Sequence, residues 1–215
     1  GNHFDNNICN NIFPSHNNWY LAASSSAPAS STPHNCNIHS NTYVSFDKQY
    51  PLVAYIDMST PNVVTLEDPC WFGTNDEEYI RQGIYDIHQN VGYAELDISN
   101  RLKRPAKEAH GIVWKIHVDG EEIMPYKKTS TPIGVGKHKF EVYYNRAMDT
   151  SINPSISFGV REPYTQHVVT EDPSWSADST IFTAYYTIGA RTMTDGVNHV
   201  HITGGCDNEK FPTVD

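Results

Sequence analysis

The chain has 215 residues, enough for one large or two small domains, and its 25 acidic residues outnumber its 15 Lys and Arg residues to give a formal net charge of −10. Such a surface repels phosphate backbones and anionic lipids, which excludes nucleic acids and membrane surfaces as expected partners. No apolar run approaches the roughly 20 residues that a membrane-spanning helix needs, so we expect no membrane insertion.

Asparagine-rich sequence in the first third of the chain carries a weak repeat. An Asn directly precedes a small apolar residue at positions 7–8, 35–36 and 62–63, and the steps between these positions are 28 and 27 residues. A repeat of this length is typical of solenoids, in which each coil contributes short strands that pair with neighbouring coils. We therefore predict stacked β coils with Ile8, Cys36 and Val63 facing inward. The alternative is a disordered polar tail.

The four cysteines, Cys9, Cys36, Cys70 and Cys206, form no C-x-x-C pair, which argues against a redox motif or a zinc ribbon. Cys9 and Cys36 are separated by 27 residues, close to the length of one predicted coil. Neighbouring strands lie about 4.8 Å apart, so this pair is our candidate for a disulfide. Free buried thiols are the alternative.

The clearest helix signal lies in the sequence GTNDEEYIRQGIYDIHQN, residues 73–90. Thr74 and Glu77 have the spacing of a capping box, and isoleucines recur at helical spacing at positions 80, 84 and 87. We predict a helix from about 75 to 89 with one narrow apolar face. The end of a solenoid exposes unpaired strand edges, and such a helix would cover them. A partner-binding helix is the alternative.

The segment around this helix resembles the closing segment of right-handed parallel β-helix proteins of the pectin-lyase-like kind. In that pattern a W-[WF]-G-T-like turn leads into a short helix with the motif I-x-x-x-I-x-D. A strand and a proline-containing linker follow, here RLKRPAK at 101–107. One departure is Cys70, where the pattern usually has Asn. The resemblance implies terminal β-helix coils, and it is carried by Trp71, Phe72, Gly73, Thr74, Ile80, Ile84, Tyr85 and Asp86.

The sequence changes character after Gly111, where short alternating runs are separated by turn residues. IVWKIHVDG alternates as a strand does and ends at Asp119-Gly120, a strong hairpin signal. Short strands at such spacing predict a β-sandwich. The side chains that we expect to face its core are Val113, Ile116, Val118, Phe140, Val142, Ile156, Phe158, Ile181, Val200 and Ile202.

The stretch KFEVYYNRAMDTSINPSISFG, residues 139–159, is similar to the Ig-like modules of bacterial surface proteins. Those modules carry an F-x-V-x-[FY]-[NS]-x-x-M-[DN] strand and turn, with a proline before the next strand. The matching residues are Phe140, Val142, Tyr144, Asn145, Met148, Asp149 and Pro154. The resemblance implies an all-β chain of two domains: terminal coils of a right-handed parallel β-helix with a short capping helix over 1–107, and an Ig-like β-sandwich over 108–215.

Residues that could carry catalysis do not converge in the sequence. Glu67 and Asp68 are adjacent at a turn, where an extended backbone points them apart. His199 and His201 share one face of a predicted strand, but spacing assigns no further zinc ligand to them. We therefore expect no catalytic residue, no cofactor and no metal site.

Aromatic side chains are the remaining candidates for ligand contact, because their rings can form a sugar-binding platform. At the two Tyr-Tyr pairs, 143–144 and 185–186, strand alternation exposes one ring of each pair. We select Trp175, Tyr144, Tyr186 and Trp19 as the candidate glycan contacts.

These features predict a non-catalytic structural or adhesion fragment of a large secreted or cell-surface bacterial β-helix protein. The alternatives are the C-terminal tail of a polysaccharide-degrading β-helix enzyme, either a lyase or a glycosidase, and a carbohydrate-binding module. The expected partners are the rest of the parent β-helix protein or a partner chain, and a polysaccharide. The expected location is extracellular or on the cell surface.

Overall fold

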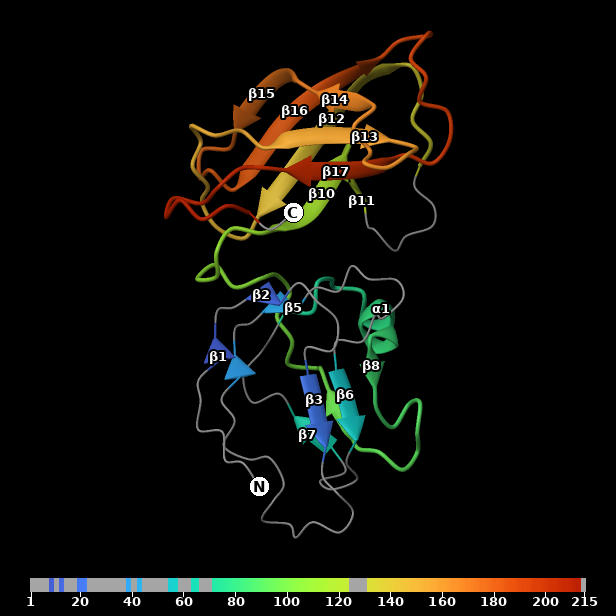
Figure 1. The fold of residues 1–215 in the computed structure, drawn as a ribbon, viewed down its shortest axis with the longest axis vertical. Coiled ribbons are helices and arrows are strands. Elements are labelled where there is room, and N and C mark those ends of the chain that lie inside the picture. The colour runs from blue at the N-terminus through green and yellow to red at the C-terminus, as the bar shows by residue number, and fades with distance from the viewer. Residues whose placement is uncertain are drawn as a thin grey trace. The chain divides into compact units, whose positions relative to one another are not determined.

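The structure, a computed structural model, describes residues 71–123 and 131–213 and, before them, the backbone of seven short strands. The chain divides into two compact units, residues 1–109 and 110–215, where the sequence predicts a boundary after residue 107. Figure 1 traces the first unit from blue to green and the second from green to red. In the described part of the chain, no helix has the length and apolar character that crossing a membrane requires.

All strand pairs of the first unit are parallel in the described residues. They join β1 to β4, β2 to β5, β7 to β9, and β3 through β6 to β8. Parallel strands need a long crossover connection, so each pair joins distant parts of the chain. The strands are β1 (Ile8–Cys9), β2 (Ile12–Phe13), β3 (Trp19–Ala22), β4 (Ile38–His39), β5 (Thr42–Tyr43), β6 (Ala54–Asp57), β7 (Val63–Thr65), β8 (Ile84–Tyr85) and β9 (Glu95–Asp97).

The register of these pairs differs from the predicted one. Ile8 pairs with Ile38 and Val63 pairs with Glu95, so the Ile8–Cys36–Val63 stack is wrong. Paired residues are 30 apart in β1–β4 and β6–β8, 32 apart in β7–β9 and 35 apart in β3–β6. The asparagines at 7, 35 and 62 precede turns or strands of unequal length, so their spacing does not set the strand register.

Helix α1 spans only Glu77–Gln82, so the predicted helix over about 75–89 is too long. Its N-cap is Asp76, whose side chain accepts a hydrogen bond from the Tyr79 amide, and Thr74 instead accepts one from the Asp76 amide. The helix ends at Gly83 because the next two residues, Ile84 and Tyr85, pair with β6 as strand β8. Tertiary pairing therefore overrides the helical spacing of Ile84 and Ile87.

The second unit contains two antiparallel sheets. The larger has five strands in the order β11-β10-β12-β16-β15, and the smaller has three in the order β14-β13-β17. This all-β, sandwich-like arrangement agrees with the sequence prediction. The strands are β10 (Val113–Val118), β11 (Glu121–Ile123), β12 (Gly136–Tyr144), β13 (Ser155–Gly159), β14 (His167–Val169), β15 (Glu171–Trp175), β16 (Ile181–Ile188) and β17 (His199–Thr203).

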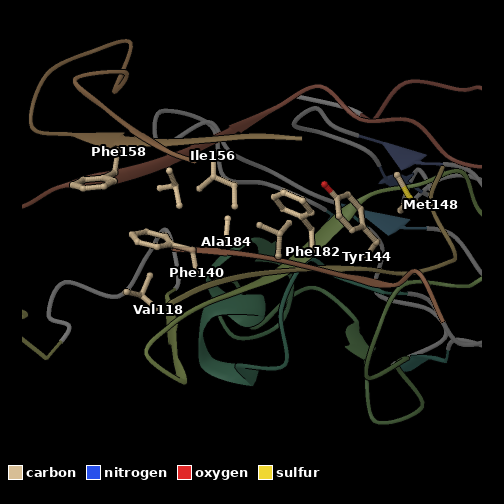
Figure 2. Close-up of a cluster of buried hydrophobic side chains, with 10 residues drawn as sticks. Val118, Phe140, Tyr144, Met148, Ile156, Phe158, Phe182 and Ala184 are labelled. Atoms are coloured by element: carbon tan, nitrogen blue, oxygen red, sulfur yellow. The ribbon is translucent and has the colours of Figure 1, made fainter. Parts of the chain in front are cut away.

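The core of the second unit lies between its two sheets. Phe140 of β12 stacks on Phe158 of β13 with ring centroids 5.6 Å apart. Figure 2 shows β13 side chains on one side of this cluster and β12 and β16 side chains on the other. The predicted inward positions Val118, Phe140, Val142, Ile156 and Phe158 are buried, and Val113, Val200 and Ile202 pack against the cluster half-buried.

Two of the predicted inward residues belong elsewhere. Ile181 pairs with Tyr143 on the outer face of the five-stranded sheet, and its neighbour Phe182 enters the core. The prediction placed β16 one residue out of phase, which reverses the face of every side chain on a strand. Ile116 pairs with the buried Val142 but stays half-buried and outside the core cluster.

Candidate functional site

Three of the four predicted glycan contacts pack in the core of the second unit. Tyr144 is 3% exposed, and burial raises the pKa of its hydroxyl, which has no hydrogen-bond partner among the described residues. Trp175 packs against Tyr144 and Phe182, and its indole N–H donates to Asn153 Oδ1 at 2.9 Å. Buried rings present no free face to a sugar, which argues against a stacking role for Tyr144.

The third core aromatic, Tyr186, is half-buried against the same cluster, and its hydroxyl lies 3.0 Å from His167 Nδ1. The fourth predicted contact, Trp19, lies in β3, of which only the backbone is described.

The opposite members of the two Tyr-Tyr pairs form the outer face of the five-stranded sheet. Tyr143 pairs with Lys115 on one side and Ile181 on the other, and Tyr185 pairs with Lys139. Directly paired residues of neighbouring strands share a face, so these side chains point away from the core. We name this surface the outer face and define it by Trp114, Lys115, His117, Lys137, Lys139, Glu141, Tyr143 and Tyr185.

Lysine ammonium groups lie over the aromatic rings of the outer face. Lys115 Nζ is 4.1 Å from the Tyr143 ring centroid and 4.9 Å from that of Trp114. Lys137 Nζ is 4.8 Å from the Tyr185 centroid. An ammonium at this distance is attracted by the negative face of the ring. The outer face therefore combines aromatic surface with cationic groups at two places.

The lysines of the outer face differ in their acidic partners. Lys137 donates to Asp172 Oδ2 at 2.6 Å and Lys139 to Glu141 Oε1 at 2.6 Å. These hydrogen bonds raise the pKa of both ammonium groups. Among the described residues, no carboxylate lies within ion-pair distance of Lys115. Lys115 is therefore the lysine of this face whose charge is not neutralised.

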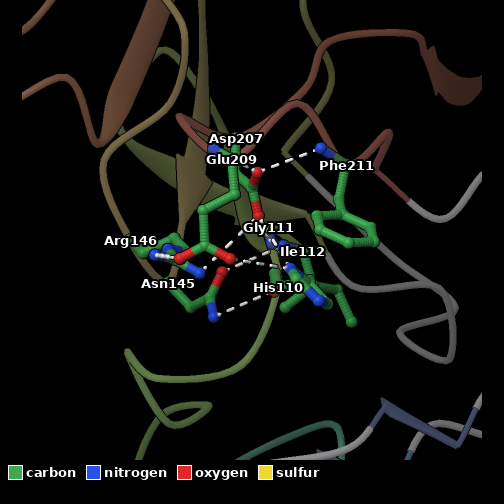
Figure 3. A network of polar contacts seen from close by, with 8 residues as sticks. All are labelled: His110, Gly111, Ile112, Asn145, Arg146, Asp207, Glu209 and Phe211. Atoms are coloured by element: carbon green, nitrogen blue, oxygen red, sulfur yellow. Dashed lines mark hydrogen bonds and ion pairs between the residues drawn. The ribbon is translucent and has the colours of Figure 1, made fainter.

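A second polar cluster surrounds Asp207 (Figure 3), whose side chain is fully buried. Its Oδ1 accepts hydrogen bonds from the amides of Glu209 and Phe211, and its Oδ2 accepts one from the amide of Gly111. His110 Nδ1 lies 3.1 Å from the same Oδ2. Burial opposes ionisation of Asp207, but these hydrogen bonds outweigh it and hold the pKa of the carboxyl below its usual range.

His110, Asp207 and Glu209 each place one ligand atom within 4.8 Å of the others, the kind of set that could hold a metal ion. An arginine competes for this position: Arg146 bonds Glu209 at 2.8 Å and lies 3.6 Å from Asp207. A guanidinium beside both carboxylates supplies the positive charge that a metal would bring. We therefore interpret the cluster as a clasp, the Asp207 clasp, that ties residues 110–111 to the turn at 207–211.

Asn145 extends this clasp by one strand. Its side-chain Oδ1 accepts from the Ile112 amide at 2.9 Å, and its Nδ2 donates to the His110 carbonyl at 3.2 Å. Asn145 is a residue of the Ig-like motif, and its side chain here holds the entry segment of the unit against the end of β12. Its role is positional rather than chemical.

A similar arrangement surrounds Asp86 in the first unit, a residue of the β-helix-like motif. Asp86 is buried, and it accepts hydrogen bonds from the amides of His88 and Leu96 and from the ring of His88. Arg81 Nη1 lies 3.6 Å from Asp86 and donates to the Leu96 carbonyl. Burial opposes ionisation, but these hydrogen bonds lower the pKa of Asp86. Asp86 thus holds β9 beside the residues that follow β8.

The cysteines add no site among the described residues. Cys206 is a free, buried thiol 3.9 Å from Asp149 Oδ2. Cys9 pairs with His39 in the β1–β4 register, and Cys36 and Cys70 lie outside the described residues. The Cys9–Cys36 disulfide stays a prediction.

The outer-face rings could have been chosen from the sequence. Phe140 and Val142 were predicted to face inward, and alternation continues that face to Tyr144, which leaves Tyr143 outside. The Asp207 clasp has no such signal, because most of its partners are backbone amides far away in the chain.

Comparisons with protein-family models, with curated proteins and with solved structures found no match to this chain.

Proposed function

We propose that this chain is a non-catalytic structural module of a large secreted or cell-surface bacterial protein. In this proposal the first unit is the end of a right-handed parallel β-helix, and the second is an Ig-like module that spaces or anchors it. The observation that carries the proposal is the set of parallel pairs at separations of 30–35 residues. Coils of similar length stacked in parallel register have this pattern.

The segment after β7 supports a closing role for residues 71–109. Strand β8 adds to the β3–β6 sheet as its last strand, and β9 adds to β7. Ile80 of α1 and Ile84 of β8 are buried, as are the apolar side chains that follow them, Ala94, Leu96 and Ile98. A segment that both pairs with the last strands and buries apolar side chains can end a stack of coils.

The second unit supports the Ig-like part of the proposal through the positions of its motif residues. Phe140, Val142 and Tyr144 bring three consecutive inward side chains of β12 into the core, and Met148 joins them. Asn145 and the Asp207 clasp then fix both ends of the unit's chain at one place. Such a unit is a stable spacer, which suits anchoring or adhesion.

The alternative, the tail of a polysaccharide-degrading β-helix enzyme, has the same architecture and differs in what lies upstream. It would carry paired carboxylates, or a base with an arginine, along one face of further coils. Intact mass of native-source material, first native and then denatured, tests the proposed module. Travel with a larger partner supports it. Travel alone at 24.2 kDa contradicts a larger parent protein. Polysaccharide cleavage by the larger species favours the enzyme.

The stacked coils can be tested by crosslinking. Leu21 and Ile56 are Cα partners in β3 and β6. Directly paired residues of neighbouring strands lie about 4.8 Å apart, within reach of a disulfide. In a background without the native cysteines, Leu21→Cys with Ile56→Cys should oxidise readily. The matched control, Leu21→Cys with Tyr55→Cys, places the thiols on opposite faces. Equal crosslinking of both pairs contradicts the stacked register.

A further inference from the structure

The outer face of the second unit carries two aromatic–lysine pairs on neighbouring strands. The first consists of Lys115 over Tyr143 and Trp114, and the second consists of Lys137 over Tyr185. Tyr143 and Tyr185 are separated by four positions along the β12–β16 register, about 14 Å at the usual rise per residue. A ligand that touches both pairs must be extended, such as a chain of several sugars.

The rings of the outer face suit contact with a sugar. Tyr143, Tyr185 and Trp114 are half-buried, so each is fixed by its surroundings and keeps part of its ring accessible. Tyr143 is further held by His117, whose ring centroid lies 4.9 Å away and whose Nδ1 lies 3.4 Å from the tyrosine hydroxyl. Rigid aromatic rings lose little conformational entropy when a ligand binds.

The charge of Lys115 indicates which sugars fit. Lys137 and Lys139 already bond Asp172 and Glu141, but among the described residues Lys115 has only rings as printed neighbours. A carboxylate on the ligand would complete a charge-assisted hydrogen bond there, stronger than any that a neutral hydroxyl makes. A neutral sugar would instead compete with the Lys115 ammonium for the face of Tyr143.

We propose that the outer face of the five-stranded sheet binds a carboxylated polysaccharide, with Tyr143 and Trp114 contacting the sugar ring and Lys115 pairing with its carboxylate. This inference goes beyond the structural role and does not depend on the β-helix. The acidic chain as a whole repels polyanions, so non-specific attraction to such a polymer is weak. Binding must therefore come from local contacts, which makes single substitutions informative.

Isothermal titration of the full chain with polygalacturonate, alginate and hyaluronan tests the proposal, and methyl-esterified polygalacturonate serves as the neutral counterpart. We expect saturable binding of at least one acidic polymer. For polygalacturonate, esterification should then abolish the response. Lys115→Gln should weaken binding by about tenfold or more, the cost of one charge-assisted hydrogen bond.

Lys137→Gln is the matched control, because that ammonium also lies over a tyrosine but is already paired with Asp172. Its affinity should stay within about twofold of the parent chain, as expected for a charge that is already neutralised. Tyr143→Leu should weaken binding, and Tyr144→Phe should not. Unchanged circular dichroism establishes that the variants are folded. Three results overturn the proposal: no binding of any acidic polymer, equal binding of the esterified one, or equal losses from both lysine variants.

Discussion

Asp86 in the first unit and Asp207 in the second hold their surroundings together with the same chemical parts. Each carboxylate accepts the amide two residues further along, a second amide from another segment, and a histidine Nδ1. An arginine lies 3.6 Å from each. Ionised and fully hydrogen-bonded, a carboxylate can be buried at tolerable cost.

The two sites differ in the length of chain that they close. Asp86 reaches Leu96 across 10 residues, whereas Asp207 reaches Gly111 across 96. A local contact can break while the rest of its unit stays folded, but a contact between the two ends of a unit breaks only when those ends separate. We therefore expect the same donors to control local opening in one unit and cooperative unfolding in the other.

The largest effect should come from Asp207→Ala. This change leaves Arg146 beside one acidic partner fewer and removes the acceptor of three backbone amides. Breaking a buried, paired charge costs about 3–5 kcal/mol. Urea unfolding of the second unit, followed by circular dichroism, should show that loss. A midpoint within error of the parent chain would contradict the clasp.

Asp86→Ala should cost less, about 2–3 kcal/mol, because water can reach the freed amides when a ten-residue segment opens. Hydrogen exchange should quicken at the Leu96 amide and leave the amides of β12 unchanged. Faster exchange throughout the second unit would show that the two carboxylates do not act in separate units.

His138 offers a third histidine–aspartate contact, this time near the surface. Its Nδ1 lies 2.7 Å from Asp119 Oδ2 and its Nε2 lies 2.7 Å from the Gly134 carbonyl. Burial opposes the charged ring, but these two acceptors outweigh it and raise the pKa of His138. Tyr186 is its strand partner, and Lys139 donates its amide to Asp119.

A raised pKa means that this stabilisation is complete below the unfolded value of about 6.5 and is lost as the pH rises through the folded value. The free energy of unfolding should therefore fall between about pH 6 and pH 8. His138→Gln should remove this slope and cost about 1 kcal/mol at pH 6. His199→Gln, at an exposed position, is the control. An unchanged slope in His138→Gln contradicts the assignment.

The smallest effect should have the opposite sign. The Tyr144 hydroxyl is buried without a hydrogen-bond partner in the described part of the chain, in contrast to the saturated carboxylates. Tyr144→Phe removes this polar atom, so stability should rise by up to about 1 kcal/mol. Chemical denaturation at neutral pH measures it. A loss above that size would reveal a partner for the hydroxyl.

The sequence predicted the features that depend on neighbouring residues and missed those that depend on distant ones. Alternation located most of the sandwich core, including Phe140, Val142 and Phe158. The same rule, applied one residue out of phase, misplaced Ile181 and selected Tyr144 instead of Tyr143. Helical spacing of isoleucines could not reveal that Ile84 pairs with β6, because that pairing spans 30 residues.

The carboxylate sites were beyond such rules. Asp207 has no distinguishing neighbours in the sequence, and its partner amide belongs to Gly111, a residue with no side chain to mark it. Asp86 was noted only through a family resemblance, which gave its position but not its hydrogen bonds.

The Asp207 clasp also determines how the second unit would respond to mechanical load. Residues 110–111 are bonded to Asp207, and Thr213 is bonded to Gly204 and Gly205. Tension applied between residues 110 and 213 therefore acts first on a few side-chain contacts at one end of the sandwich. The strands would then be peeled apart one hydrogen bond at a time, instead of being sheared along their length, and such a unit yields at low force.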